Sequence, residues 1–163
     1  MFVLNTKRLY NIYMENLKKI TLYTDGSCIG NPGPGGYAYI LIYNDIKKEF
    51  SGYEPETTNN RMELSAVING LNQLKEPCDV TIYTDSAYVL NAFEQNWIAN
   101  WQLKGWRTAN KKDVLNKDLW LKLLEAIERH TIHWVKVKGH ADNELNNRCD
   151  ILARGEILKR TTN

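Results

Sequence analysis

The sequence predicts an α/β fold in which helices flank a five-stranded mixed sheet of three antiparallel strands followed by two parallel strands. Two observations lead to this prediction. Three strand-like segments come first and are joined by short connections, which favours an antiparallel meander. Helical segments then alternate with two further strand-like segments, and a strand that follows a helix needs a crossover that places it parallel to an earlier strand.

The three strands of the meander are read from composition. Residues 20–24 are rich in β-branched and aromatic side chains, which favour a strand. Glycines and prolines crowd residues 31–36 and predict a turn there. The second and third strands are then expected at residues 37–43 and 48–53.

The second half of the predicted fold starts with a helix at residues 58–75. Its apolar residues recur at the i, i+3, i+4, i+7 spacing of an amphipathic helix. The remaining elements are a strand at 80–84, a helix from Ser86 as N-cap to about 96, a helix at 116–129, a strand at 131–137 and a helix at 143–159.

One domain is expected at residues 18–160, because no repeat or second core is apparent. Residues 1–17 are interpreted as an N-terminal extension that could form a flexible arm. Residues 97–117 are polar, aromatic and basic, and they predict a protrusion from the core. Residues 97–122 contain six basic and two acidic residues, although the whole chain carries a net charge of only +2.

Composition excludes several classes of protein. With 43% apolar and 25% charged residues, the chain does not resemble a collagen, a coiled coil or a disordered protein. The longest apolar run is far shorter than the roughly 20 residues of a membrane span, and no secretory signal is read at the N-terminus. Three cysteines argue against a disulfide framework and a zinc site. We therefore expect a cytoplasmic protein.

Two predicted strands end in nearly the same tetrapeptide, Tyr-Thr-Asp-Gly and Tyr-Thr-Asp-Ser, which contain Asp25 and Asp85. In open α/β sheets, ligands collect at the carboxyl ends of strands. If the two strands are parallel neighbours, both carboxylates project into one cleft. An aspartate at a strand end is by itself often only a turn former or a helix cap.

Two further acidic residues, Glu63 and Asp150, lie among small or apolar residues at helical spacing. A glutamate on such a face is unusual without a partner, whereas Asp150 alone could be a solvated helix residue. Four converging carboxylates would repel one another unless divalent cations bound them, and all-oxygen ligands suit Mg²⁺ or Mn²⁺. A pair of such ions is the usual means of displacement at phosphorus.

Six segments resemble the bacterial-type ribonuclease H family, type 1, in order and at compatible spacing. The resemblance runs from about residue 18 to 155. The segments are TDGSCIGNPGPGGYA, TTNNRMEL, YTDSAYV, NWIANWQLKGWRTANKK, WVKVKGH and NNRCDILA.

The resemblance implies a ribonuclease H-like fold and an endonuclease that cuts the RNA strand of an RNA–DNA hybrid, leaving 3′-hydroxyl and 5′-phosphate ends. It places Asp25, Glu63, Asp85 and Asp150 at the positions of the family's metal-binding acids, with two Mg²⁺ ions expected, Mn²⁺ as a substitute, and Asp25 bridging both. His140 matches a loop histidine that assists proton transfer or product departure. No membrane partner is implied, and we expect a monomer.

The resemblance also suggests how a hybrid would be held. Minor-groove contacts fall on Asn31, Asn59 and Asn60, and a DNA-strand phosphate site falls on Thr58 and Asn116. A basic protrusion that would hold the DNA strand contains Trp97, Trp101, Lys104, Trp106, Arg107, Lys111 and Lys112, although at least one tryptophan is expected to pack internally.

The sequence departs from the family at three places. Ala87 stands where a glutamine is common, Glu56 lies near where a basic residue often helps, and the loop at 141–145 lacks the usual small, proline-containing pattern. Two other functions remain open: a hybrid-binding module without catalysis, and a DNA nuclease of the transposase or resolvase type on the same fold. The four acids favour an enzyme, and the segments at 57–64 and 97–112 favour a hybrid substrate.

Overall fold

A computed structural model describes residues 5–138 and 143–162 of the chain. Five strands form one sheet in the order β3-β2-β1-β4-β5. The strands are β1 (Lys18–Cys28), β2 (Gly33–Tyr43), β3 (Ile46–Thr57), β4 (Cys78–Thr84) and β5 (Thr131–Lys136). The helices are α1 (Thr6–Asn16), α2 (Asn59–Asn72), α3 (Ala87–Glu94), α4 (Trp97–Leu103), α5 (Lys117–Glu128) and α6 (Glu144–Thr161).

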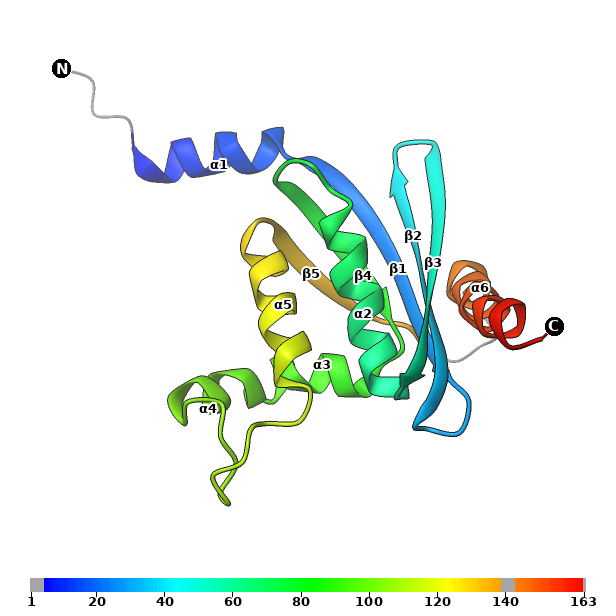
Figure 1. The fold of residues 1–163 in the computed structure, drawn as a ribbon. Helices are drawn as coiled ribbons and strands as arrows, with labels where there is room; N and C mark the ends of the chain where they lie inside the picture. Colours follow the sequence, from blue (N-terminus) through cyan, green and yellow to red (C-terminus); the bar gives the residue numbers. More distant parts are fainter. Residues whose placement is uncertain (1–4, 139–142, 163) are drawn as a thin grey trace.

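The pairing of the strands confirms the predicted mixed sheet. β1 pairs antiparallel with β2, and β2 pairs antiparallel with β3. β4 pairs parallel with both β1 and β5. Figure 1 shows α2, α3 and α5 over one face of the sheet and α6 over the other. The sheet therefore separates two cores.

The larger core lies between the sheet and α2, α3 and α5. Leu22 and Ile82 on the sheet and Leu71 on α2 are fully buried in it, and burial of each such side chain is worth about 1.5–3 kcal/mol. The smaller core packs Ala38 and Ile40 of β2 against small residues of α6. The small side chains of Ala38 on β2 and of Cys149 and Ala153 on α6 let the helix lie close to the sheet.

Two strand boundaries correct the sequence prediction. β1 continues to Cys28, so Asp25 lies inside a strand and not beyond its end. β2 begins at Gly33, within the stretch expected to be a turn. Close packing explains the glycines there: a Cβ on Gly35 would lie 2.4 Å from Thr57, and one on Gly36 would lie 2.1 Å from a backbone oxygen of α6.

Helix α1 occupies most of the N-terminal extension and was not predicted. Asn5 caps it, because its side chain accepts a hydrogen bond from the N–H of Lys7 at 3.0 Å. The Thr131 hydroxyl at the start of β5 lies 3.6 Å from the Met14 sulfur. The proposed flexibility of this extension remains a prediction. Among the described residues, none of the helices is long and apolar enough to cross a membrane.

Candidate active site

Asp25 lies inside β1, and Asp85 lies at the matching place directly after the last residue of the parallel strand β4. The pairing of β1 with β4 ends at Tyr23 and Tyr83, and each aspartate lies two residues further along its chain. Because side chains alternate between the faces of a sheet, Asp25 lies on the same face as Tyr23. An oxygen of Asp85 lies within 4.8 Å of an oxygen of Asp25. The convergence predicted from the repeated tetrapeptide is therefore present.

Glu63, the fifth residue of α2, reaches this point from the start of the second turn of the helix. The helix begins after Thr58, whose hydroxyl oxygen accepts a hydrogen bond from the N–H of Arg61 at 3.3 Å. Gly26 lets α2 approach β1, since a Cβ there would lie 2.4 Å from the backbone nitrogen of Glu63. The glycine after Asp25 thus sets the distance between two of the acids.

The three carboxylates form one compact cluster. Asp25, Glu63 and Asp85 each offer an oxygen, and these oxygens lie within 4.8 Å of one another. Asp25 and Glu63 are each 5% exposed. Burial, with the charges of Asp85 and Asp150, raises the pKa of Asp25 to about 7. Burial and the charges of Asp25 and Asp85 raise the pKa of Glu63 well above its usual value.

This cluster fits a divalent cation. Oε2 of Glu63 is buried and has no hydrogen-bond partner among the described residues, and a buried polar atom without a partner is costly. All the donors are carboxylate oxygens, which suit Mg²⁺ or Mn²⁺ better than zinc. A bound cation would supply both the missing partner and the charge that lets the acids ionise.

Asp150, the fourth predicted acid, lies on α6 at the edge of this cluster. Its charge contributes to the raised pKa of Asp25. Its Oδ1 accepts a hydrogen bond from Nε of Arg154 at 3.1 Å, one helical turn away. Asp150 is not among the three residues whose oxygens converge within 4.8 Å. The structure therefore brings three of the four acids together and places the fourth beside them.

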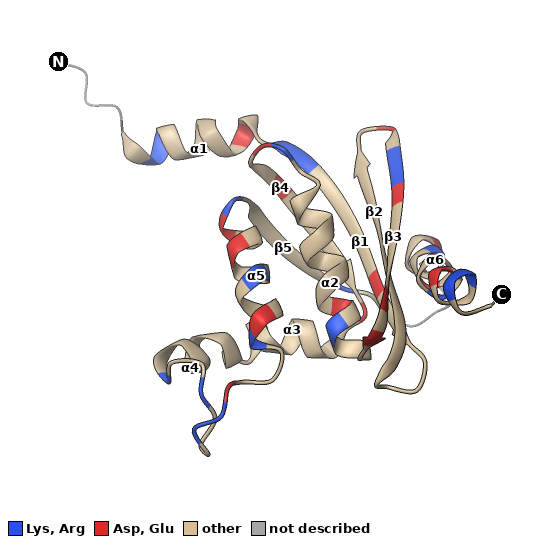
Figure 2. Ribbon diagram, in the orientation of Figure 1, with Lys and Arg blue, Asp and Glu red and all other residues tan. Residues whose placement is uncertain are grey.

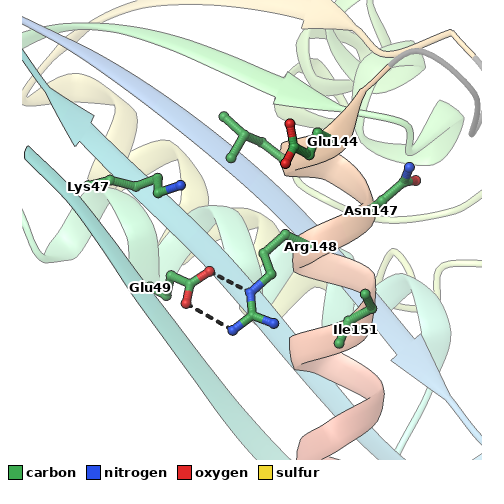
Figure 3. Close-up of a pocket in the computed structure, with 7 residues that line it drawn as sticks. Lys47, Glu49, Glu144, Asn147, Arg148 and Ile151 are labelled. Carbon is green, nitrogen blue, oxygen red and sulfur yellow. Dashed lines mark hydrogen bonds and ion pairs between the residues drawn. The ribbon is translucent and has the colours of Figure 1, made fainter. Parts of the chain in front are cut away.

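An ion pair joins α6 to the edge strand β3. Arg148 donates to both oxygens of Glu49, at 2.7 and 3.1 Å. Figure 3 shows this guanidinium reaching across a groove of about 460 Å³. Since Asp150 follows two residues later, the pair helps to fix the part of α6 that carries it.

His140 lies outside the described residues, as does part of the loop 141–145. The role predicted for this histidine stays a prediction.

Comparison with known proteins decides the family. A family model described as RNase H matches residues 17–157, which is most of the chain. The chain belongs to the ribonuclease H family. The ribonuclease H of Acetivibrio thermocellus is 57% identical over 143 residues, covering 88% of this chain and 97% of that protein. The ribonuclease H of Moorella thermoacetica is 57% identical over 141 residues, covering 86% and 93%.

Solved structures of ribonucleases H share the fold. LC9-RNase H1, described as a type 1 RNase H with the type 2 active-site motif, is 28% identical with a TM-score of 0.79, covering 89% of this chain and 74% of that one. LC11-RNase H1 in complex with an RNA/DNA hybrid is 24% identical with a TM-score of 0.68, covering 88% and 99%. The second likeness shows the fold alone.

The amides expected to contact a hybrid in a ribonuclease H meet at the start of α2. Oδ1 of Asn31 accepts a hydrogen bond from the N–H of Asn59 at 2.9 Å, although the two are far apart in sequence. Asn31 and Asn59 are exposed, whereas Thr58 and Asn60 are half-buried. Asn59 lies one helical turn before Glu63 on α2.

The three predicted substrate-contacting tryptophans all take part in internal packing. Trp101 lies 6.2 Å from Trp97, 5.7 Å from Trp106 and 5.5 Å from Trp120, measured between ring centroids. Trp97, Trp101 and Trp106 are half-buried and pack against the larger core. The tryptophans therefore anchor the protrusion, and only their exposed parts could reach a nucleic acid.

The cations of the protrusion are exposed. Lys104, Arg107 and Lys111 line a shallow groove of about 520 Å³, and Lys112 follows it. Figure 2 shows basic residues at the C-terminal end of α4 and along the loop after it. The loop is held in shape because Arg107 donates to the carbonyl of Lys111 at 3.0 Å.

Asn116, at the start of α5, belongs to a hydrogen-bond network that the sequence analysis missed. Its side chain bonds to Arg61 and Tyr88, and Arg61 pairs with Asp118 at 2.8 Å. A signal was present: Arg61 lies in the first turn of α2, where the helix dipole disfavours a cation unless an acidic partner is near.

Two residues that depart from the family's pattern, Ala87 and Glu56, are both exposed.

Proposed function

We propose that the protein hydrolyses the RNA strand of RNA–DNA hybrids in the presence of a divalent metal ion. The observation that carries this proposal is the cluster of Asp25, Glu63 and Asp85, in which a buried carboxylate oxygen of Glu63 has no partner in the described part of the chain. Membership of the ribonuclease H family supports it, as does the hybrid bound to LC11-RNase H1.

Four acids would hold the metal ions: Asp25, Glu63 and Asp85, whose oxygens converge, and Asp150 at the edge of the cluster. Two Mg²⁺ ions, or Mn²⁺ in their place, would activate the attacking water and stabilise the leaving 3′-oxygen. The water oxygen forms a bond to phosphorus while the bond from phosphorus to the 3′-oxygen breaks, giving 3′-hydroxyl and 5′-phosphate ends. The chain's own contribution is to hold buried carboxylates close together in the absence of metal. His140 is assigned to proton transfer or product departure.

The surface beside the acids suits a hybrid. An enzyme that selects the RNA strand must sense the 2′-hydroxyl, and Asn31, Asn59 and Asn60 offer exposed or half-buried amides near Glu63. The exposed cations of the protrusion would bind phosphates of the DNA strand and add affinity without base specificity. We further propose a monomer acting in the cytoplasm.

A panel of labelled substrates tests this function. The protein is incubated with an RNA–DNA hybrid, duplex RNA and duplex DNA, each with Mg²⁺, with Mn²⁺ or with EDTA. We expect cleavage only of RNA in the hybrid and only with metal. Cleavage of duplex DNA would instead support the transposase-type nuclease, and binding of the hybrid without any cleavage would support a non-catalytic module.

A further inference from the structure

The side-chain amide of Asn116 has two chemically different ends, and the protein fixes which end is presented. An amide oxygen only accepts hydrogen bonds, whereas the NH₂ group donates two. An anionic phosphate oxygen is attracted by the NH₂ group and repelled by the oxygen. The value of Asn116 as a phosphate contact therefore depends on its orientation.

Arg61 determines that orientation. Its Nη1 lies 3.3 Å from Oδ1 of Asn116, and a guanidinium has donors but no acceptor. Only the amide oxygen can face it. The NH₂ group then faces Tyr88, whose hydroxyl oxygen lies 3.0 Å from Nδ2 of Asn116.

Tyr88 is itself held in place. Nε1 of Trp120 donates to the same hydroxyl oxygen at 3.1 Å, and the ring centroids of Tyr88 and Trp120 lie 5.3 Å apart. Asn116 thus uses its oxygen on Arg61 and one N–H on Tyr88. Among the hydrogen bonds of the described residues, its second N–H has no acceptor, so one donor is left for a ligand.

Arg61 is poorly placed to act as a phosphate ligand by its charge. Both of its terminal nitrogens donate to Asp118, at 2.9 and 2.8 Å, and this bond with Asp118 raises the pKa of Arg61. The pair has no net charge, and the guanidinium plane is taken up by a carboxylate. Asp118 therefore turns Arg61 from a phosphate-binding cation into a fixed donor toward Asn116.

We propose that Arg61, held by Asp118, is a positioning residue that fixes the amide of Asn116 with an N–H directed to a phosphate oxygen of the substrate's DNA strand. This inference rests on the proposed function and assigns a role to two residues outside the predicted site. The network also joins α2, which carries Glu63, to α5, which follows the basic protrusion. The network thereby fixes the position of the substrate contacts near Glu63 relative to those on the basic protrusion.

The test compares KM and kcat for hybrid cleavage in Arg61→Met, Asn116→Ala and the double variant. Loss of one hydrogen bond predicts a rise in KM of about 3- to 10-fold for each single variant, with kcat little changed. Because both changes remove the same contact, the double variant is expected to match Asn116→Ala. Effects that multiply in the double variant would show that Arg61 acts independently, and would overturn the proposal.

Arg129→Met is the matched control. Arg129 also ties α5 to α2, since its Nη2 donates to Oδ1 of Asn72 at 2.6 Å at the other end of the helices, and its loss changes the net charge equally. We expect its KM to equal that of the wild type. An equal rise in KM for Arg129→Met and Arg61→Met would reduce the role of Arg61 to helix anchoring, and would overturn the proposal.

Asn116→Asp tests the donor without altering Arg61. It places an oxygen where the free N–H points, and we expect a larger rise in KM than for Asn116→Ala. A KM equal to that of the wild type would contradict the proposed orientation. Failure of the wild-type protein to cleave a hybrid would instead contradict the proposed function itself.

Discussion

The rings of Tyr23 and Tyr83 stack with their centroids 4.5 Å apart and their planes 12° from parallel. They form the last paired position of the parallel strands β1 and β4. Two residues further along each chain segment are Asp25 and Asp85. The stack therefore supports two carboxylates whose mutual repulsion would otherwise push the strand ends apart.

Gly26→Ala should disrupt the acidic cluster. The added Cβ would lie 2.4 Å from the backbone nitrogen of Glu63 and 2.5 Å from the backbone carbon of Met62, so α2 must move away from β1. Such overpacking costs about 1–3 kcal/mol of unfolding free energy, and displacement of Glu63 should greatly reduce cleavage. Thermal unfolding and hybrid cleavage measure the two effects.

Gly155→Ala is the matched control for that change. A Cβ on Gly155, which lies in α6, would meet nothing within 4 Å. Alanine in a helix is more favourable than glycine by about 0.5–1 kcal/mol, so a slightly higher melting temperature and unchanged cleavage are expected. Equal losses in both variants would contradict the importance of the contact at Gly26.

The stability of the metal-free protein should depend on pH through Asp25. Its folded-state pKa of about 7 lies above the value of 3.8 expected for an unperturbed aspartate. The native state therefore binds more protons than the unfolded state between about pH 4 and 7, and stability falls as pH rises through this range. Asp25→Asn removes the titration and should stabilise the metal-free protein at pH 8 by on the order of 4 kcal/mol.

Urea unfolding in EDTA at pH 5 and pH 8 measures this difference. The gain from Asp25→Asn should be large at pH 8 and smaller at pH 5. Mg²⁺ should stabilise the wild type more at pH 8 than at pH 5, because the bound carboxylates must be ionised. A gain that does not vary with pH would contradict the raised pKa of Asp25.

Binding of a hybrid should weaken with salt in proportion to the cations of the protrusion. Lys111→Ala should reduce the slope of log affinity against log salt by about 0.7–0.9, because one fewer phosphate is neutralised. Lys159→Ala, on the last turn of α6 and beside Glu156, changes the net charge equally and should leave the slope unchanged. Fluorescence anisotropy in EDTA measures the hybrid affinity of both variants. An equal slope for Lys111→Ala and Lys159→Ala would show that the hybrid does not bind at the protrusion.

The sequence predicted the parts of the fold that follow from local patterns. Asp25 and Asp85 were paired because a repeated tetrapeptide ends two strands, and Glu63 stood out as an acid on an apolar helix face. The strand at Gly33–Gly36 was missed because local turn preference competes there with long-range packing against α6. The link from Arg61 to Asp118 was missed because it joins residues on two helices that are separate in sequence.

Single-turnover cleavage of a labelled hybrid by Asp25→Asn tests the central claim most directly. Hybrid affinity is measured alongside by anisotropy, so that loss of binding and loss of chemistry are distinguished. The cluster of Asp25, Glu63 and Asp85 as a metal-dependent active site predicts that binding is retained while the cleavage rate with Mg²⁺ falls by several orders of magnitude. Cleavage at the wild-type rate by Asp25→Asn would contradict it.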